Sequence, residues 1–227
     1  MPQRDHDIYA SQPLRDLLSE QAAVLLPELQ RCAGEHGLLL CAAAQDQSPA
    51  LPLLGHWVRL QLSDMRWQGD LGARSDEPLP FVDDAFDLLL LRHAIEGAPM
   101  PRDLLEEAIR VLAPGGMLVV SGVHPLSAWA PWFYWRSRGC GLSLALPARL
   151  RRWLQRSGLQ VEQVQRLGRP WPGVSDRVYG RHALGGGYVL IARKPRRLAL
   201  PLRLRRQLQR APAHAGLVSG ARRHTAP

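Results

Sequence analysis

The sequence predicts a three-layer α/β fold with a mostly parallel sheet. Three observations support this prediction. The run Phe86–Leu91 is apolar apart from Asp87, which indicates a strand buried on both faces, as in a parallel sheet covered by helices. Helical and strand-like patterns alternate along the chain. The segment Pro114-Gly115-Gly116 separates a helical pattern from an apolar run, as a turn that permits positive φ would.

An amphipathic helix is expected first, because apolar residues recur at helical spacing within Leu14–Cys32, and Pro27 is expected to kink or divide it. Three short strands should follow, at Leu38–Ala44, at His56–Leu62 and around Arg66–Leu71. The gaps between them are too short for full crossover helices. The first half of the sheet is therefore expected to be trimmed or irregular.

The second half of the chain has a more regular pattern. Pro101–Leu112 is the clearest helix, because proline suits a first turn and Asp103 suits the amino end. The remaining segments are a strand at Met117–Val123, a basic helix at Pro147–Ser157, and strands at Leu159–Leu167 and Tyr188–Ala192. In this arrangement Phe86–Leu91 should be the central strand.

Composition excludes several classes of protein. The first residues are polar and charged, and no stretch of 18 residues is cleanly apolar, so we expect a cytoplasmic protein without a signal peptide or transmembrane segment. Three widely spaced cysteines predict neither a disulfide framework nor a metal site. The net charge of +9 is concentrated in the tail, because ten Lys/Arg and no Asp/Glu follow from Arg193 onward.

These observations predict three parts. Residues 1–35 should form an amino-terminal helical segment, and residues 36–195 the α/β domain. Residues 196–227 are expected to be a basic, largely disordered tail that contacts polyanions, either RNA or an anionic membrane. A solvated tail without a partner is the alternative.

Two segments resemble a known family. The sequences LPFVDDAFDLLLLRHAIEG (79–97) and DLLEEAIRVLAPGGMLVVSG (103–122) are similar to the second half of class I S-adenosylmethionine-dependent methyltransferases of the small-molecule, ubiquinone-biosynthesis-like type (type 11). LQRSGLQVEQVQRLG (154–168) resembles the family's later helix–strand pair. The resemblance implies a Rossmann-like fold with a seven-stranded-type sheet, and S-adenosylmethionine as the cofactor. It also implies that residues 122–129 form part of the substrate wall.

The first half departs from the family pattern. LLLCAAAQD stands where the family has a glycine loop, and Asp46 would bring a carboxylate toward the cofactor's own carboxylate unless it points away. Asp64 is the only acidic residue near the end of the second strand, where the family binds the ribose. By position, the resemblance assigns cofactor contacts to Cys41, Ala42, Ala43, Ala44, Asp64, Asp70, Asp76, Leu79 and Arg92.

Two histidines and an aromatic segment are candidates for chemistry and substrate binding. His93 and His124 each follow a buried strand, so either is a candidate general base, with a structural histidine as the alternative. In WAPWFYWRSR (129–138), Trp129 and Trp132 are candidates for stacking on an aromatic or prenylated substrate or for a membrane interface. The alternative is a lid over the end of the sheet.

The leading functional hypothesis is a methyltransferase that uses S-adenosylmethionine on an unidentified substrate, for which a small-molecule or lipid-like compound is the candidate. The alternative is a catalytically inactive, methyltransferase-like binding module, which the degenerate glycine loop favours.

Overall fold

The computed structural model describes residues 8–138, 140–173 and 180–196. Its centre is an eight-stranded sheet with the strand order β4-β3-β2-β1-β5-β6-β8-β7. The four inner strands are parallel and comprise β2 (Leu54–Ser63), β1 (Gly34–Cys41), β5 (Phe86–Arg92) and β6 (Leu112–Val123). The predicted fold class is confirmed, and β5 lies at the centre of the sheet as expected.

Antiparallel strands flank this parallel centre on both sides. β3 (Arg66–Gly69) pairs with β2, and the short β4 (Ala73–Arg74) pairs with β3. On the other side, β8 (Gly187–Arg193) lies between β6 and β7 (Gln160–Leu167) and is antiparallel to both.

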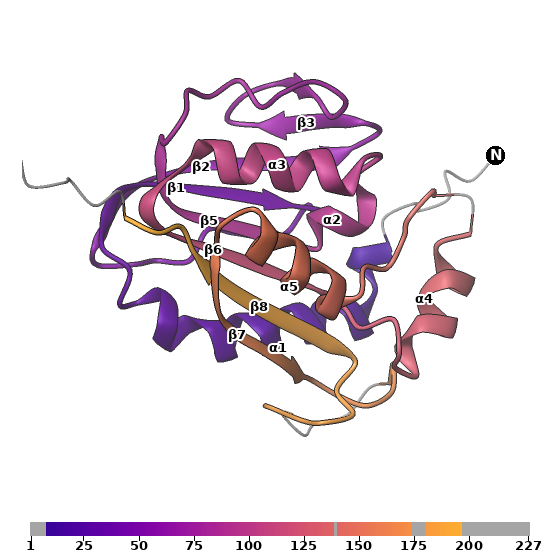
Figure 1. Ribbon diagram of the computed structural model, residues 1–227. Coiled ribbons are helices and arrows are strands. Elements are labelled where there is room, and N and C mark those ends of the chain that lie inside the picture. The colour runs from indigo at the N-terminus through magenta and orange to yellow at the C-terminus, as the bar shows by residue number, and fades with distance from the viewer. Residues whose placement is uncertain (1–7, 139, 174–179, 197–227) are drawn as a thin grey trace, which may run out of the picture. The chain divides into compact units, whose positions relative to one another are not determined.

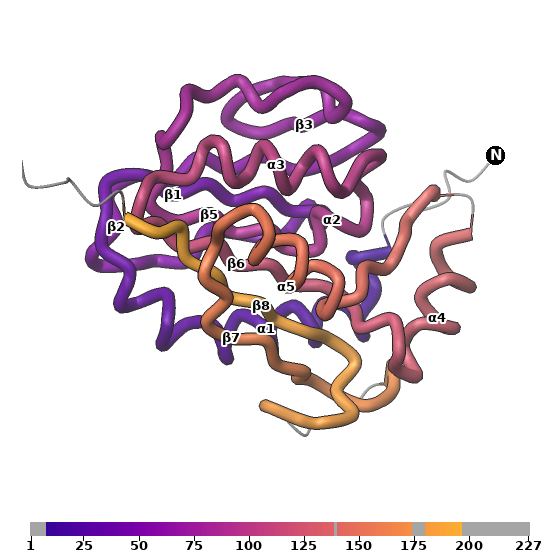
Figure 2. The backbone as a smooth tube through the Cα atoms, in the orientation of Figure 1, coloured from indigo at the N-terminus to yellow at the C-terminus, as the bar shows by residue number. Residues whose placement is uncertain are grey.

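The first half of the sheet is trimmed, as the short gaps in the sequence predicted. Figure 2 follows the chain from β2 directly into β3, through a tight turn at Asp64 and Met65 with φ values of 47° and 62°. Residues 42–53 join β1 to β2 without a helix. Because β2 and β3 are antiparallel and form a hairpin, the connection between these two strands needs no crossover helix.

Helices cover both faces of the sheet (Figure 1). One face packs against α2 (Ala94–Gly97), α3 (Pro101–Val111) and α5 (Pro147–Arg156). The other face packs against the 3₁₀ helix η1 (Ile8–Ala10), α1 (Gln12–Leu29) and α4 (Trp129–Arg136). The sequence patterns predicted neither α2 nor α4.

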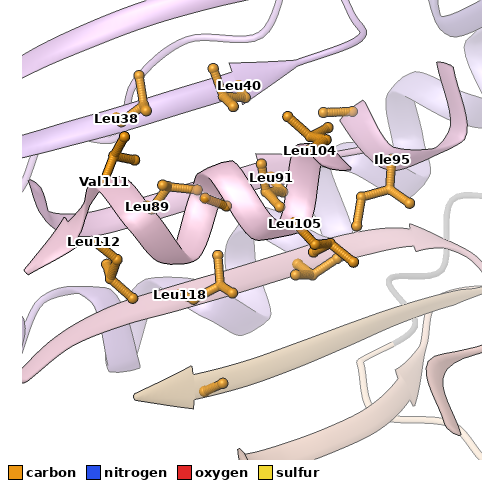
Figure 3. Packing of buried hydrophobic residues seen from close by; sticks show 14 of the residues in the cluster. Leu38, Leu40, Leu89, Leu91, Ile95, Leu104, Leu105, Val111, Leu112 and Leu118 are labelled. Carbon is orange, nitrogen blue, oxygen red and sulfur yellow. The ribbon is translucent and has the colours of Figure 1, made fainter. Parts of the chain in front are cut away.

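The apolar run of β5 contributes alternate side chains to the two faces. Leu89 and Leu91 pack toward Leu104 and Leu105 of α3, as Figure 3 shows, while Leu88 and Leu90 belong to the cluster under α1. All four β5 leucines are at most 1% exposed. Burying one such side chain contributes about 1.5–3 kcal/mol, which explains why the strand is apolar on both faces.

Two polar side chains, those of Asp87 and Lys194, bind backbone groups at the ends of neighbouring elements. Asp87, the one polar residue of the run, accepts the backbone N–H of Glu35 at 2.8 Å through Oδ2 and so fixes the start of β1. Lys194 Nζ, which follows β8, contacts Asp84 Oδ1 at 2.6 Å and the carbonyls of Ile109 (2.8 Å) and Leu112 (2.6 Å). It therefore satisfies carbonyl groups at the end of α3 that have no partner within the helix.

α1 continues through Pro27 to Leu29 as one helix, so Pro27 does not divide it. The leucine side chains of α1 are buried against the sheet. The predicted tail, 196–227, lies outside the described residues except for Arg196. Its boundary and its expected polyanion contacts therefore stay predictions.

Candidate functional site

The parallel strands β1, β5 and β6 end at one edge of the sheet, where polar and turn-forming residues follow them. β1 leads into the turn Ala42–Asp46, β5 into His93 and β6 into His124. The first two ends are joined directly, because the N–H of Ala42 donates to the carbonyl of Arg92 at 3.1 Å. Ligands of open parallel sheets bind beyond the carboxyl ends of the strands, so this edge is the candidate site.

The turn Ala42–Asp46 has an ordinary backbone. None of its residues has a positive φ, so its alanines avoid the strain that a glycine-loop conformation would impose on them. Arg59 of β2 holds the turn down. Its Nη2 donates to the carbonyl of Ala44 at 2.6 Å, and its Nε donates to the carbonyl of Asp46 at 2.7 Å.

Asp46 does not point out of the turn but inward, where it pairs with Arg92. Arg92 Nη1 lies 2.9 Å from Asp46 Oδ1, and the two side chains are only 10% and 7% exposed. Burial raises the pKa of the Asp46 carboxyl, and the positive charge of Arg92 partly opposes this. Arg92 Nη2 also donates to the carbonyl of Leu18 in α1 at 3.2 Å.

The Arg92–Asp46 pair is incompletely bonded. Arg92 Nε and Asp46 Oδ2 are both buried, and neither has a hydrogen-bond partner within the described part of the chain. Such orphaned groups are uncommon in buried positions, because each lost hydrogen bond costs about 1–3 kcal/mol. The pair therefore presents one donor and one acceptor that the protein itself leaves unused.

A pocket of about 290 Å³ lies beside this pair, between α1, the β1–β2 connection and β5. Apart from Ser19, its wall is apolar until it reaches Arg92. It is lined by Ser19, Ala22, Ala23, Leu25, Leu26, Leu29, Pro49, Leu90 and Arg92.

His93 is fully buried, and both of its ring nitrogens have partners. Nδ1 lies 2.9 Å from Glu96 Oε2, and Nε2 lies 2.8 Å from Gln21 Oε1. The Glu96 carboxylate in turn accepts hydrogen bonds from the hydroxyl of Tyr9 at 2.6 Å and from the N–H of Val123 at 2.5 Å. This network joins η1, α1, α2 and the end of β6.

The orientation of Gln21 determines where His93 carries a proton. The amide nitrogen of Gln21 donates to the carbonyl of Gly122 at 3.1 Å, so its oxygen must face His93 and Nε2 must carry hydrogen. His93 also has a φ of 56°, a left-handed conformation that costs a residue with a side chain about 1–3 kcal/mol. The hydrogen bonds of the network hold His93 in this conformation. This geometry favours a positioning role, and the catalytic assignment of His93 stays a prediction.

His124 is partly exposed at the same edge. Burial, with a smaller effect of the charge on Arg166, lowers the pKa of His124 to about 4. Its Nδ1 accepts the N–H of Leu126 at 3.1 Å, so the neutral ring carries its hydrogen on Nε2. His124 can therefore donate a hydrogen bond at neutral pH, whereas a role as general base requires Nδ1 to release Leu126.

The thiol of Cys41 is not a nucleophile in this site. It is fully buried, and burial, together with the charge of Asp46, raises its pKa to about 12. Ala43 is likewise fully buried, whereas Ala44 is exposed. Of the alanines assigned to the cofactor loop, Ala44 therefore presents most surface.

The predicted acidic contacts are spread over the hairpin. Asp64 lies in the β2–β3 turn, while Asp70 Oδ2 accepts the N–H of Arg59 at 2.7 Å and supports the hairpin. Asp76 pairs with Arg74 at 2.7 Å. Asp76 and Leu79 line a second pocket of about 240 Å³, with Trp67, Ser75, Glu77, Pro78, Met100, Asp103, Leu104, Glu106 and Glu107. Only these two of the predicted residues share that pocket.

The two candidate tryptophans differ in access. Trp129 is fully buried, and its Nε1 donates to the carbonyl of Arg169 at 2.9 Å. Trp132 packs edge-to-face on Trp129 with ring centroids 5.7 Å apart and is partly exposed. Trp132 is thus the more accessible of the two, and substrate contact by either stays a prediction.

Sequence reasoning did not identify Tyr9, Gln21, Arg59 and Glu96 as residues of this edge. Glu96 had the clearest signal, because it is a charged residue three positions after His93 in an otherwise apolar turn. Gln21 gives no such signal, since its partners are 72 or more residues away in the chain.

Known structures share this architecture. A methyltransferase from Thermotoga maritima, described as a possible histamine N-methyltransferase, is 13% identical with a TM-score of 0.51, over 78% of this chain and 99% of that one. A putative methyltransferase from Bacillus halodurans is 20% identical with a TM-score of 0.50, over 76% and 98%. Residues 60–120 match the family model described as "Methyltransferase domain". Over residues 60–120 the chain therefore resembles methyltransferases, and it shares the fold of the solved ones. The predicted resemblance is confirmed.

Curated relatives match parts of this chain. "Uncharacterized protein YafS" of Escherichia coli is 47% identical over 49 residues, which are 22% of this chain and 20% of that protein. The ubiquinone/menaquinone biosynthesis C-methyltransferase of Roseobacter denitrificans is 30% identical over 111 residues, 49% and 42% of the two chains. The chain thus spans between about a fifth and two fifths of the length of its curated relatives.

Within the described residues, no helix is both long and apolar enough to cross a membrane. The same part of the chain holds no cluster of three or more His, Cys, Asp or Glu that is arranged to bind a metal ion.

Proposed function

We propose that this domain binds S-adenosylmethionine at the carboxyl edge of β1 and β5 and transfers its methyl group to a small-molecule acceptor. The observation that carries the proposal is the incompletely bonded pair of Arg92 and Asp46. The match of residues 60–120 to the methyltransferase family supports the reaction class.

The unused groups of the pair suit the amino-acid end of the cofactor. That end carries a carboxylate and an ammonium group. Arg92 Nε–H would hold the carboxylate, and Asp46 Oδ2 would accept from the ammonium. Both atoms are buried, so binding requires the turn Ala42–Asp46, to which Asp46 belongs, to move. The inward Asp46 is then a ligand and not the repulsive charge that its position in the sequence suggested.

The adenosine end has fewer defined contacts. Asp76 and Leu79 remain our candidates, because they share a pocket with the apolar side chains of Trp67 and Met100. The pocket also carries the carboxylates of Glu77, Asp103, Glu106 and Glu107, so apolar side chains lie beside acceptors for the exocyclic amine of a flat adenine ring.

S-adenosylmethionine supplies an activated sulfonium methyl group, so the protein has to position the partners and exclude water. The network around His93 fixes the ends of β5 and β6 for this purpose, through Gln21 and Glu96. His124 would donate its Nε2–H to an acceptor substrate, and Trp132 would contact the substrate's apolar part. The similarity to the quinone-biosynthesis relative supports a small-molecule acceptor.

Calorimetric titration with S-adenosylmethionine tests the proposal. Wild-type protein should bind, and Arg92→Gln and Asp46→Asn should each weaken binding by about tenfold, or 1.4 kcal/mol. Arg193→Ala is the matched control, because Arg193 forms a partly exposed pair with Glu162 and lies opposite Met117, away from the carboxyl end of β6. Replacing both Ala42 and Ala44 by glycine should tighten binding, because the backbone can then approach the ligand more closely.

The alternative of a binding module without catalysis has its own outcome. If neither wild-type protein nor the double glycine variant binds S-adenosylmethionine at about 1 mM, the proposal fails and the inactive module is favoured. The two hydrogen bonds from Arg59 to the turn Ala42–Asp46 would then explain why S-adenosylmethionine does not bind, because they hold the turn in place.

A further inference from the structure

The charge of this chain is divided between its two halves. All but two of the 20 acidic residues precede Val123, and the two exceptions are Glu162 and Asp176. Within the described residues after Val123, Glu162 is the one acidic side chain, and it pairs with Arg193 at 2.9 Å. The elements α4, α5, β7 and β8 and their loops therefore carry the basic excess, and we call them the basic side, although Asp16 and Glu20 of α1 pair with Arg169 there.

The basic side also carries exposed aromatic and aliphatic side chains. Leu126 is 72% exposed, Trp135 58%, Trp171 69% and Leu184 64%, and we call these four residues the apolar rim. Tyr134, 48% exposed, is next to Trp135. Within the described part of the chain, the strongly exposed aromatic side chains are Tyr134, Trp135 and Trp171, and all three lie here.

Hydrogen bonds hold the rim together as one surface. Arg166 Nη2 donates to the carbonyl of Leu126 at 3.2 Å and to that of Gly185 at 3.0 Å, which joins the β6–α4 loop to the loop before β8. The Nε1 of Trp129 donates to the carbonyl of Arg169, which joins the first turn of α4 to the loop that follows β7. Figure 1 shows α4 on the same side of the sheet as these loops.

We propose that the apolar rim and the arginines beside it dock this domain on an anionic lipid membrane. Exposed apolar groups of this size mark an interaction surface. Tryptophan and tyrosine side chains favour the boundary between lipid headgroups and acyl chains, and arginines attract anionic headgroups. Arg136, Arg138 and Arg181 are exposed beside the rim.

The composition of the rim favours a membrane over a nucleic acid. Stacking on bases uses aromatic faces and arginine, and both are present. The aliphatic side chains Leu126 and Leu184 cannot stack on bases, but an acyl layer can bury them. The docked orientation also turns the acidic hairpin and α3 away from the like-charged lipid surface.

Vesicle sedimentation with the full chain tests this inference independently of methyl transfer. The probes are phosphatidylcholine vesicles with and without phosphatidylglycerol at about a quarter of the lipid. Wild-type protein should bind the anionic vesicles more tightly. The double variant Leu126→Ser/Trp171→Ser should lose about tenfold in partitioning, and Arg136→Gln/Arg138→Gln should bind less and depend less on salt.

Val82→Ser is the matched control, because Val82 is 76% exposed but lies before β5, on the acidic half of the chain. It should bind as wild type does, and circular dichroism should show every variant folded. Every variant keeps the basic tail, so differences between them report on the rim alone. Equal binding by wild type and the Leu126/Trp171 variant would overturn the inference. Absence of binding to anionic vesicles would also overturn it, as would binding to oligouridylate in place of vesicles.

Discussion

Replacing Glu96 by alanine should nearly unfold the domain. The substitution removes the acceptor of the Tyr9 hydroxyl and the Val123 N–H, and it removes the partner of His93 Nδ1. Each buried polar group that loses its partner costs about 1–3 kcal/mol, so for these three groups we expect a total of about 3–9 kcal/mol. A domain of this kind has about 5–15 kcal/mol of stability in all.

Replacing Glu96 by glutamine should be far milder. The amide oxygen can still accept from Val123, the amide nitrogen can donate to Nδ1 of a neutral His93, and the Tyr9 hydroxyl can rotate to accept. Because every group keeps a partner, the expected loss is about 1 kcal/mol. Tyr9→Phe removes the hydrogen bond from the Tyr9 hydroxyl to Glu96 and should cost about the same.

Urea denaturation followed by circular dichroism measures these differences. With a slope of about 2 kcal/mol per M, Glu96→Ala should lower the midpoint by about 1.5–4.5 M, and the other two variants by less than about 1 M. If the alanine and glutamine variants have the same midpoint, the reasoning is refuted, because hydrogen-bond satisfaction would then not decide stability. If the alanine variant does not fold, the glutamine and phenylalanine variants still test the expected order.

Three further outcomes are expected. Burial raises the pKa of Cys41 to about 12, so iodoacetamide at about pH 8 should modify the partly exposed Cys140 and spare Cys41, as read by peptide mass spectrometry; labelling of native Cys41 would contradict this. Burial lowers the pKa of His124 to about 4, so the unfolded chain binds more protons below about pH 6.5, and stability present above that pH is lost as the pH falls toward 4. Wild type should therefore lose about 1–2 kcal/mol more than His124→Gln between about pH 7 and 4.5, after allowance for solvent screening, and parallel pH profiles would refute this. Lys194→Met should lower the melting temperature by several degrees, about 1–3 kcal/mol, because it removes a charge and three hydrogen bonds; an unchanged melting curve would show that this contact contributes nothing.

The sequence was sufficient for the parts of the fold that local pattern controls. The unbroken leucines of β5 required cover on both faces, and the stripe of α3 with its leading proline defined that helix. The short gaps after β1 and β2 correctly predicted a reduced first half. The α4 helix was missed because its aromatic sequence lacks a clear apolar stripe, and because Trp129 is buried through a contact 40 residues away.

The candidate site was less accessible to sequence reasoning. Its strand-end residues could be placed, because the carboxyl ends of parallel strands meet at one edge. Their partners could not, since Arg59, Gln21 and Tyr9 reach the edge from three different elements. The direction of Asp46 was also open in the sequence. A carboxylate in a cofactor loop suggested repulsion, and only the three-dimensional arrangement turns it toward Arg92.

Lys194 is the only lysine in the chain, and its ammonium group is held by oxygens of Asp84, Ile109 and Leu112. Amine-directed chemistry on lysine side chains is therefore confined to this single group, which is 20% exposed. Acylation there would remove the positive charge that joins the end of β8 to the end of α3. The rate at which an amine reagent modifies Lys194 would consequently report how often these two elements separate, so the chain contains its own probe of that local opening.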